Sequence, residues 1–259
     1  TSFSASSVRL CGASDTAPNC TQTSVVRTEG VYTITNGTVS FVPATGYTGT
    51  PATPIAYSVT DALGQRASST YTPTVTPPSA PAASADTSSG LKGVAQTSNP
   101  LANDAADPAV ALDTTSVKLC GASETAPACT QATLTNTAGT YSVDPATGVI
   151  TFTPSASFTG VAPAVTYRVA DTAGSVASST YTATVYGPPS ASPDTTTGAY
   201  GAKQTQDLLA NDTADPLATL TASSVRLCGS TETAPACTQT SLTRAEGVYS
   251  ITNGTVTFT

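Results

Sequence analysis

The chain has 259 residues, of which 39% are hydrophobic and only 10% charged, and it contains no His, Met or Trp. Its net charge of −7 and acidic pI disfavour binding to nucleic acid or insertion at anionic membranes, which attract clusters of Lys and Arg. Without His the Ser-His-Asp and Cys-His arrangements of hydrolases cannot form, so we expect a protein that is not an enzyme.

One short sequence occurs three times. LCGASDTAPNCTQ begins at Leu10, and close copies begin at Leu119 and Leu227. The period of about 108 residues is too long for solenoids or propeller blades and suits a row of independent domains. We predict three repeats: 1–78, truncated at its N-terminal side; 79–187, complete; and 188–259, truncated at its C-terminal side.

Two linkers separate the repeats, at residues 76–87 and 186–195, and both are rich in Pro, Ala and Ser. Pro restricts the backbone to extended conformations, so we expect short, semi-rigid joints.

Alternating apolar residues predict strands along the complete repeat. In chain order these lie at residues 116–120, 132–136, 140–144 and 148–154, followed by a hairpin over 164–185. The first and third copies place Asn-Gly between two such runs, which is a strong hairpin signal. Asp61 and Asp171 begin the turns DALG and DTAG and are expected to form turns.

No segment shows a capped apolar stripe with helical period. We therefore predict an all-β chain of tandem immunoglobulin-like antiparallel β-sandwich repeats, with about seven or eight strands each, forming an elongated rod.

The six cysteines fall into three pairs, each with eight residues between its members. Strict pairing indicates disulfides and an oxidising, extracellular location. Zinc is the alternative, but it usually takes four ligands at closer Cys spacing, often with His. We expect local disulfides between these residues: Cys11 and Cys20, Cys120 and Cys129, Cys228 and Cys237.

One acidic position repeats inside the cysteine loop, as Asp15, Glu124 and Glu232. A single carboxylate beside Thr, Ala and Pro suits a solvated turn residue. The alternative is a loop residue that contacts a ligand.

The sequences LANDAADP and LANDTADP each gather one Asn and two Asp residues. These oxygen donors could bind Ca²⁺ if the turns brought them together, or they could bond nearby backbone as Asx turns. The typical Gly and bidentate Glu of calcium loops are absent, so we expect no cofactor, with Ca²⁺ as the alternative. The candidate ligands are Asn103, Asp104 and Asp107, with Asn211, Asp212 and Asp215 as their equivalents.

Three further readings rest on Thr, Ser and Lys. Short Thr-x-Thr runs are ordinary strand surface and only weakly suggest ice binding. The Ser and Thr residues could also carry O-linked sugar. Lys–Asn isopeptide bonds should recur at one strand position, and no Lys is kept in all copies.

Neither end of the chain coincides with a predicted repeat boundary. We expect either a window from a longer fibre or partial repeats that neighbouring subunits complete.

The sequence LLANDTADPLATLTASSVRLCG, followed by GVYSITNGTVTFT and the earlier SFTG, VTYRVADTAG and TYTATV, resembles CshA-type fibril repeats of bacterial cell-surface adhesins. It is also similar to tandem bacterial immunoglobulin-like repeats. The resemblance covers essentially the whole chain and implies a rod or fibril that projects from a cell. The cysteine loop departs from that pattern.

We therefore expect a structural segment of an extracellular fibril or adhesin stalk on a bacterial cell surface, with neighbouring repeats of the same chain as its main partners. Lateral or end-to-end self-association is a further expectation, including strand exchange between subunits. The alternative function is an adhesive module whose repeated loop contacts carbohydrate or a host protein and gains avidity from repetition.

Overall fold

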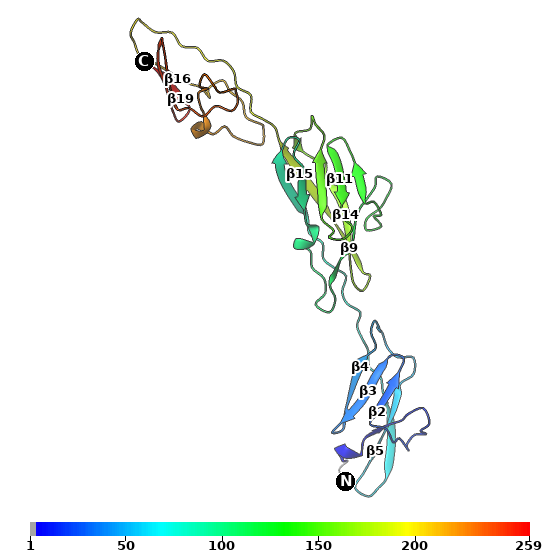
Figure 1. The fold of residues 1–259 in the computed structure, drawn as a ribbon. Coiled ribbons are helices and arrows are strands. Elements are labelled where there is room, and N and C mark those ends of the chain that lie inside the picture. Colours follow the sequence, from blue (N-terminus) through cyan, green and yellow to red (C-terminus); the bar gives the residue numbers. More distant parts are fainter. Residues whose placement is uncertain (1–3) are drawn as a thin grey trace. The chain divides into compact units, whose positions relative to one another are not determined.

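The computed structural model describes residues 4–259, and the chain divides into two compact units. Unit 1 runs to Ala80 and includes residues 107–110, whereas unit 2 comprises residues 81–106 and 111–259. Figure 1 shows strands in each unit, and the described helices are three 3₁₀ turns of three residues each. None of these turns approaches the length of a helix that spans a bilayer.

Unit 1 contains two small antiparallel sheets. One has the order β1-β5-β6 and the other the order β2-β3-β4. Their bounds are β1 Arg9–Leu10, β2 Ser24–Arg27, β3 Gly30–Thr35, β4 Thr38–Pro43, β5 Ile55–Thr60 and β6 Arg66–Tyr71. Leu10, Tyr32 and Ile55 are fully buried between the sheets.

The predicted Asn-Gly hairpin is present between β3 and β4. Thr35 pairs with Thr38, and both turn residues have positive φ, 49° at Asn36 and 78° at Gly37. A two-residue turn of this kind matches the twist of the flanking strands and tolerates few residues other than Asn and Gly.

The middle repeat, in unit 2, is a complete two-sheet sandwich. One sheet has the order β10-β11-β12-β8 and the other the order β13-β15-β14-β9, with β7 beside β15. The bounds are β7 Asp86–Leu91, β8 Gln96–Ser98, β9 Leu112–Leu119, β10 Thr133–Thr135, β11 Gly139–Val143, β12 Ile150–Pro154, β13 Gly160–Val161, β14 Val165–Asp171 and β15 Val176–Tyr186. Every strand predicted by its residues in this repeat is therefore confirmed, but the repeat has nine strands, more than the seven or eight expected.

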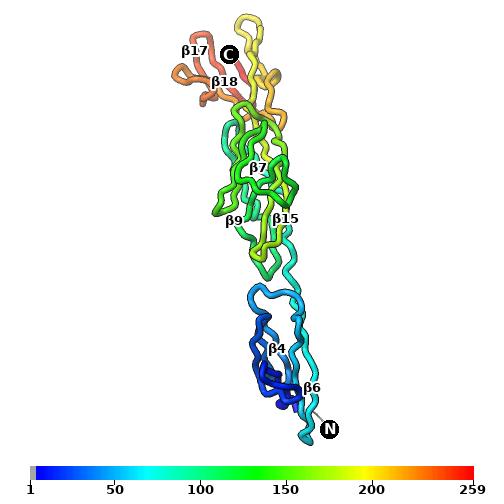
Figure 2. Tube along the Cα trace, turned by 90° about the vertical axis from the view of Figure 1, so that its right-hand side faces the viewer, coloured from blue at the N-terminus to red at the C-terminus, as the bar shows by residue number. Residues whose placement is uncertain are grey.

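One pairing departs from the antiparallel expectation. β7 runs parallel to β15 over six residue pairs, from Asp86 opposite Tyr181 to Leu91 opposite Tyr186. Figure 2 labels both strands within the middle repeat. The chain can place these strands in parallel because most of the repeat lies between them, which supplies the long connection that parallel strands need. The sequence of β7, DTSSGL, carries little apolar alternation, which explains why it escaped the strand pattern.

Aromatic side chains fill the centre of the middle sandwich. The Tyr141 and Phe152 rings lie 4.6 Å apart, and Tyr181 meets Tyr141 edge-on at 6.0 Å. All three are fully buried. Such tilted and edge-to-face pairs add to the stabilisation that burial alone provides.

The third repeat, also in unit 2, forms one antiparallel sheet in the order β16-β19-β18-β17. Its strands are β16 Gln204–Asp207, β17 Ser241–Arg244, β18 Gly247–Thr252 and β19 Thr255–Phe258. Tyr249 and Phe258 keep the ring contact of the other copies, at 4.7 Å, but both are only partly buried.

Acidic residues form the second hairpin turns as predicted. In the first repeat the Asp61 carboxylate accepts hydrogen bonds from the backbone N–H groups of Leu63 and Gln65 at 2.9 and 2.8 Å. Asp171 does the same for Ala173 and Ser175 in the middle repeat. Each carboxylate thus closes its own turn, which is the usual role of Asp at such positions.

Candidate functional site

The cysteine loop is built in the same way in each copy. In the first repeat Leu10 and Gln22 exchange backbone hydrogen bonds of 2.8 and 3.0 Å, which closes the base of the loop. The same bridge joins Leu119 to Gln131 and Leu227 to Gln239. Leu10 and Leu119 are fully buried, so the base of the loop is anchored in its sandwich.

A local disulfide crosses each loop just above this base. The pairs are Cys11–Cys20, Cys120–Cys129 and Cys228–Cys237, with Cα–Cα distances of 4.2, 4.2 and 4.4 Å. The described residues contain no free cysteine. By the chain-entropy estimate, closing a loop of about ten residues stabilises its domain by roughly 2–3 kcal/mol.

The repeated carboxylate lies inside the loop and is only partly exposed. Glu124 accepts hydrogen bonds from the backbone N–H of Gly121 at 2.6 Å and from the Gln131 side-chain amide at 3.0 Å. It also accepts bonds from the backbone N–H and the hydroxyl of Thr130. Glu232 repeats this arrangement with Gly229, Thr238 and Gln239.

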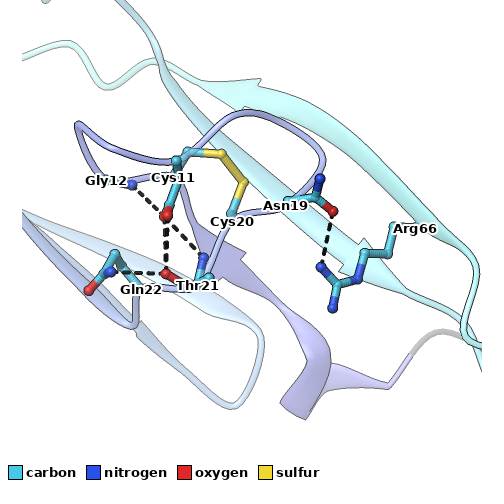
Figure 3. Close-up of a disulfide and its surroundings, with 8 residues drawn as sticks. Cys11, Gly12, Asn19, Cys20, Thr21, Gln22 and Arg66 are labelled. Atoms are coloured by element: carbon cyan, nitrogen blue, oxygen red, sulfur yellow. Dashed lines mark hydrogen bonds between the residues drawn. A yellow bond between two sulfur atoms is a disulfide. The ribbon is translucent and has the colours of Figure 1, made fainter.

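Asp15 forms a shorter version of this arrangement in the first repeat. Its carboxylate accepts bonds from the backbone N–H groups of Gly12 and Thr21 at 3.0 and 3.1 Å and from the Thr21 hydroxyl. Figure 3 labels Gly12 and Thr21 beside the disulfide. The Gln22 amide donates to the Thr21 hydroxyl instead of to the carboxylate. The acidic residue therefore ties the two ends of the loop together in all three copies.

These bonds stabilise the ionised carboxylate. Hydrogen bonds from the Thr130 hydroxyl, the Gly121 N–H and the Gln131 amide lower the pKa of Glu124 to about 2. Bonds from Thr238 and Gly229 lower the pKa of Glu232 to about 2 as well. A carboxylate whose acceptor sites face these donors has little capacity left for a ligand outside the loop.

The solvent-facing tip of the loop carries small neutral side chains. In the middle repeat Ala122, Ser123, Thr125, Ala126 and Pro127 are exposed. Such a surface offers little charge and little apolar area for a high-affinity contact. The first repeat adds one contact of its own, in which Arg66 of β6 donates to the Asn19 side chain at 3.3 Å (Figure 3).

The two acidic motifs hold neighbouring backbone. In the third repeat the Asn211 amide donates to the Pro193 carbonyl at 3.1 Å, and the Asp212 carboxylate accepts from the Ser192 N–H at 2.8 Å. The Asp215 carboxylate accepts from the N–H groups of Gly187 and Leu217 at 2.7 and 2.9 Å.

The middle copy of the motif has the same pattern. Asn103 donates to the Ala85 carbonyl at 3.1 Å, and Asp104 accepts from the Ser84 N–H at 2.7 Å. Asp107, which belongs to unit 1, accepts from the Ser79 N–H and hydroxyl at 3.0 and 2.8 Å. In each motif the Asn and the first Asp thus bond adjacent residues of the preceding linker, and the second Asp bonds a residue earlier in that linker. Residues 4–259 contain no group of three or more acidic, His or Cys side chains placed to hold a metal.

Asp104 lies in a polar cluster that the sequence analysis did not predict. The Tyr167 hydroxyl donates at 2.8 Å to the Ser84 carbonyl and lies 3.2 Å from both Asp104 carboxylate oxygens. Asp86, two residues after Ser84, is buried, and its Oδ2 has no hydrogen-bond partner among the described residues. Burial raises the pKa values of both Asp86 and Asp104.

A second set of residues also escaped the sequence analysis, namely Thr21 and Gln22 with their equivalents. Their signal was available, because CTQ ends all three copies of the loop sequence. Its meaning depends on folding, since only the closed loop brings Thr and Gln opposite the carboxylate.

The fold and the site define a protein built from tandem β repeats, each with one local disulfide. The family described as "Surface adhesin CshA repetitive domain" matches residues 4–75 and 78–185, which together are more than half of the chain. The chain therefore belongs to this family of surface adhesin repeats, and the predicted resemblance is confirmed. The two matched stretches correspond to the first and middle repeats; the exact predicted boundaries stay a prediction.

No curated protein matches the chain. Among solved structures it is similar to the crystal structure of Down Syndrome Cell Adhesion Molecule (DSCAM) isoform 1.30.30, N-terminal eight Ig domains. The match has 13% identity and a TM-score of 0.30 and covers 79% of this chain and 26% of that chain. A TM-score this low supports no conclusion about the protein.

Proposed function

We propose that this chain is a structural spacer in an extracellular fibril or adhesin stalk on a bacterial cell surface. Its role is mechanical: each sandwich adds length, and the joints limit bending. Membership of a surface adhesin repeat family supports the location, and that family is one of adhesins and not of enzymes.

The observation that carries the proposal is the hydrogen-bonded linker before the third repeat. Ser190 and Thr213 exchange backbone bonds of 2.8 and 2.9 Å, between the side-chain contacts that Asp215 and Asp212 make to Gly187 and Ser192. A Pro-rich linker already favours extended backbone. Bonds along most of its length reduce its freedom further, which suits a spacer that must keep its length.

The test compares the flexibility of this linker in the wild-type chain and in the variant Asp212→Ala/Asp215→Ala. The amide ¹⁵N relaxation of Gly187, Ser190, Ala191 and Ser192, the linker residues between 187 and 193 that carry an N–H, should match that of the sheets in the wild type and show added fast motion in the variant. The control is Asp113→Ala, whose carboxylate bonds only its own strand at Thr115. A linker already mobile in the wild type would contradict the proposal.

One observation supports the alternative, adhesive function: the exposed tip of the cysteine loop occurs three times in the chain. Because Glu124 faces inward, substituting it would disturb the loop itself and could not identify a contact. The sharper variants are Ser123→Arg and Ala126→Arg, which change only exposed positions. Cell-binding that these variants abolish would favour the adhesive function, and binding that they leave unchanged would favour the spacer.

Self-association is not needed for the spacer function. Lateral contacts between chains would be promoted by the low charge and the many small residues of the surface. Sedimentation of the 259-residue chain over a range of concentrations measures such contacts directly.

A further inference from the structure

The first repeat contains a cavity that lies away from the cysteine loop. It is open to solvent and has a volume of about 740 Å³. One side is formed by the β2–β3 turn, with Arg27 and Glu29, and the other by the loop after β4, with Tyr47, Thr50 and Thr53. All of these residues belong to unit 1.

An opposite-charge pair is held at the wall of this cavity. The Arg27 Nη1 atom lies 3.8 Å from the Glu29 Oε1 atom and donates to the Thr53 carbonyl at 3.0 Å. Glu29 in turn accepts a hydrogen bond of 3.0 Å from the buried Tyr32 hydroxyl. The hydrogen bonds to the Thr53 carbonyl and from the Tyr32 hydroxyl therefore hold both charged groups in place.

Arg27 keeps free hydrogen-bonding capacity, whereas Glu29 is buried and accepts bonds from the hydroxyls of Tyr32 and Thr28. A guanidinium has five N–H donors and a carboxylate about four acceptor sites. Among the described residues, no acceptor bonds the Nε or Nη2 group of Arg27. Arg27 can therefore donate toward a molecule in the cavity, and the hydroxyls of Thr48 and Thr53 in its wall can both donate and accept.

The middle repeat shows that the fold does not require this cavity. Arg27, Glu29 and Tyr47 correspond there to Asn136, Ala138 and Phe158, so each charged or hydroxyl group is lost. Ala138 is fully buried, and Phe158 packs against the core.

The loops differ in length as well as in chemistry. The first repeat has one residue more between Tyr47 and Ile55 than the middle repeat has between Phe158 and Val165. Thr50 is replaced by Val161 in the shorter loop. The third repeat has Arg244 and Glu246 at the positions of Arg27 and Glu29. The polar cavity is thus a feature of the first repeat that the middle repeat lacks, although both copies share one scaffold.

We propose that this cavity binds a neutral saccharide. The paired charges sum to zero, so an anion would meet Glu29 and a cation would meet Arg27 at close range. An apolar ligand would need a predominantly hydrophobic wall, whereas this wall combines threonine hydroxyls and an ion pair with Tyr47, Pro51 and Ala52. Sugar hydroxyl groups both donate and accept, and their C–H faces fit an aromatic ring such as that of Tyr47.

This inference goes beyond the spacer function, because a spacer needs no ligand. The test uses the 259-residue chain and saturation-transfer NMR with glucose, galactose, mannose and N-acetylglucosamine, each at about 10 mM, where even millimolar affinities are detected. At least one of these sugars should bind the wild type. Binding by none of the four overturns the proposal.

The middle repeat supplies the residues for the decisive variants. Arg27→Asn/Glu29→Ala should weaken binding by about tenfold or more, as expected when charged hydrogen-bond partners are removed. Tyr47→Phe/Thr50→Val should weaken it less while sparing the core. The control Arg66→Gln removes a charge outside the cavity and should bind as the wild type does.

Amide dispersion in the same spectra shows whether each variant is folded, and the middle repeat already tolerates these residues at the equivalent positions. Unchanged binding in both folded double variants overturns the proposal. So does tighter binding of glucuronate than of glucose, because it would make the cavity an anion site. Neither result bears on the linker measurement, so failure here and failure of the spacer function are distinguishable.

Discussion

The first and middle repeats share a scaffold and differ in what completes it. Both place a Tyr–Phe ring pair 4.6 Å apart between two sheets and add a second Tyr edge-on. In the middle repeat β7 and β8 add to these sheets, and many more residues of that repeat are fully buried. The first repeat forms the aromatic centre and the cysteine loop without counterparts of β7 and β8. Only the middle repeat, which has both strands, also has a large buried core.

The largest expected effect comes from the aromatic centre. Phe152→Ala should lower the free energy of unfolding of the middle repeat by about 3–5 kcal/mol, because it leaves a cavity among fully buried rings. Phe41→Ala in the first repeat should cost less, since Phe41 is only partly buried. Hydrogen exchange resolved by repeat measures both; equal losses would contradict the comparison.

Loss of the loop disulfide should follow in size. Cys120→Ala/Cys129→Ala should reduce the stability of the middle repeat by roughly 2–3 kcal/mol. The matched pair Cys11→Ala/Cys20→Ala should cost the first repeat a similar amount, because both loops have the same length and base. Denaturant unfolding followed by repeat-specific NMR signals gives the two values. A large difference would show that the loops are not equivalent.

A pH dependence should separate the two repeats. Burial raises the pKa values of Asp86 and Asp104, so their favourable contribution is present below the unfolded value of about 4 and is lost as pH rises through the folded value. Asp86→Asn should therefore reduce the loss of middle-repeat stability between pH 4 and 8. The first repeat, which has no such described pair, should not respond. Melting curves that are unchanged by the substitution at every pH would refute this explanation.

The loop carboxylates should give the smallest effect, with the opposite sign. The pKa of Glu124 is lowered to about 2, so its contribution is present above the unfolded value near 4.5 and is lost as pH falls toward 2. Glu124→Gln should weaken the middle repeat slightly at neutral pH and flatten its acid transition. Asp15→Asn should do less, because Asp15 lacks the contact with the Gln side chain. A larger effect for Asp15 would reverse this order.

The strands of the middle repeat and the Asn-Gly hairpin could be predicted because each has a local pattern, either alternating apolar residues or a turn pair with positive φ. β7 could not, because its Ser-rich sequence becomes a strand only by pairing with β15, about 95 residues away in the chain.

The sequence identified the acidic residues of the cysteine loop and of the two LAND motifs, but it did not predict all of their hydrogen-bond partners. Asp15, Glu124 and Glu232 were recognised as one repeated position, yet their inward direction depends on Thr and Gln residues that meet them only across the closed loop. The partners of Asp104 in the polar cluster come from Ser84 and Tyr167, on segments far apart in sequence. A local sequence pattern cannot predict contacts between residues that lie so far apart in the chain.

Electron microscopy of the native material, with and without reductant, tests the spacer function most directly. The account predicts fibres with a regular axial period of roughly 30–40 Å, the length of a sandwich built from strands of about 7–10 residues together with its joint. Because each disulfide lies within one loop, reductant should leave the fibres intact. Fibres that dissolve in reductant, or material without an axial period, would contradict the account.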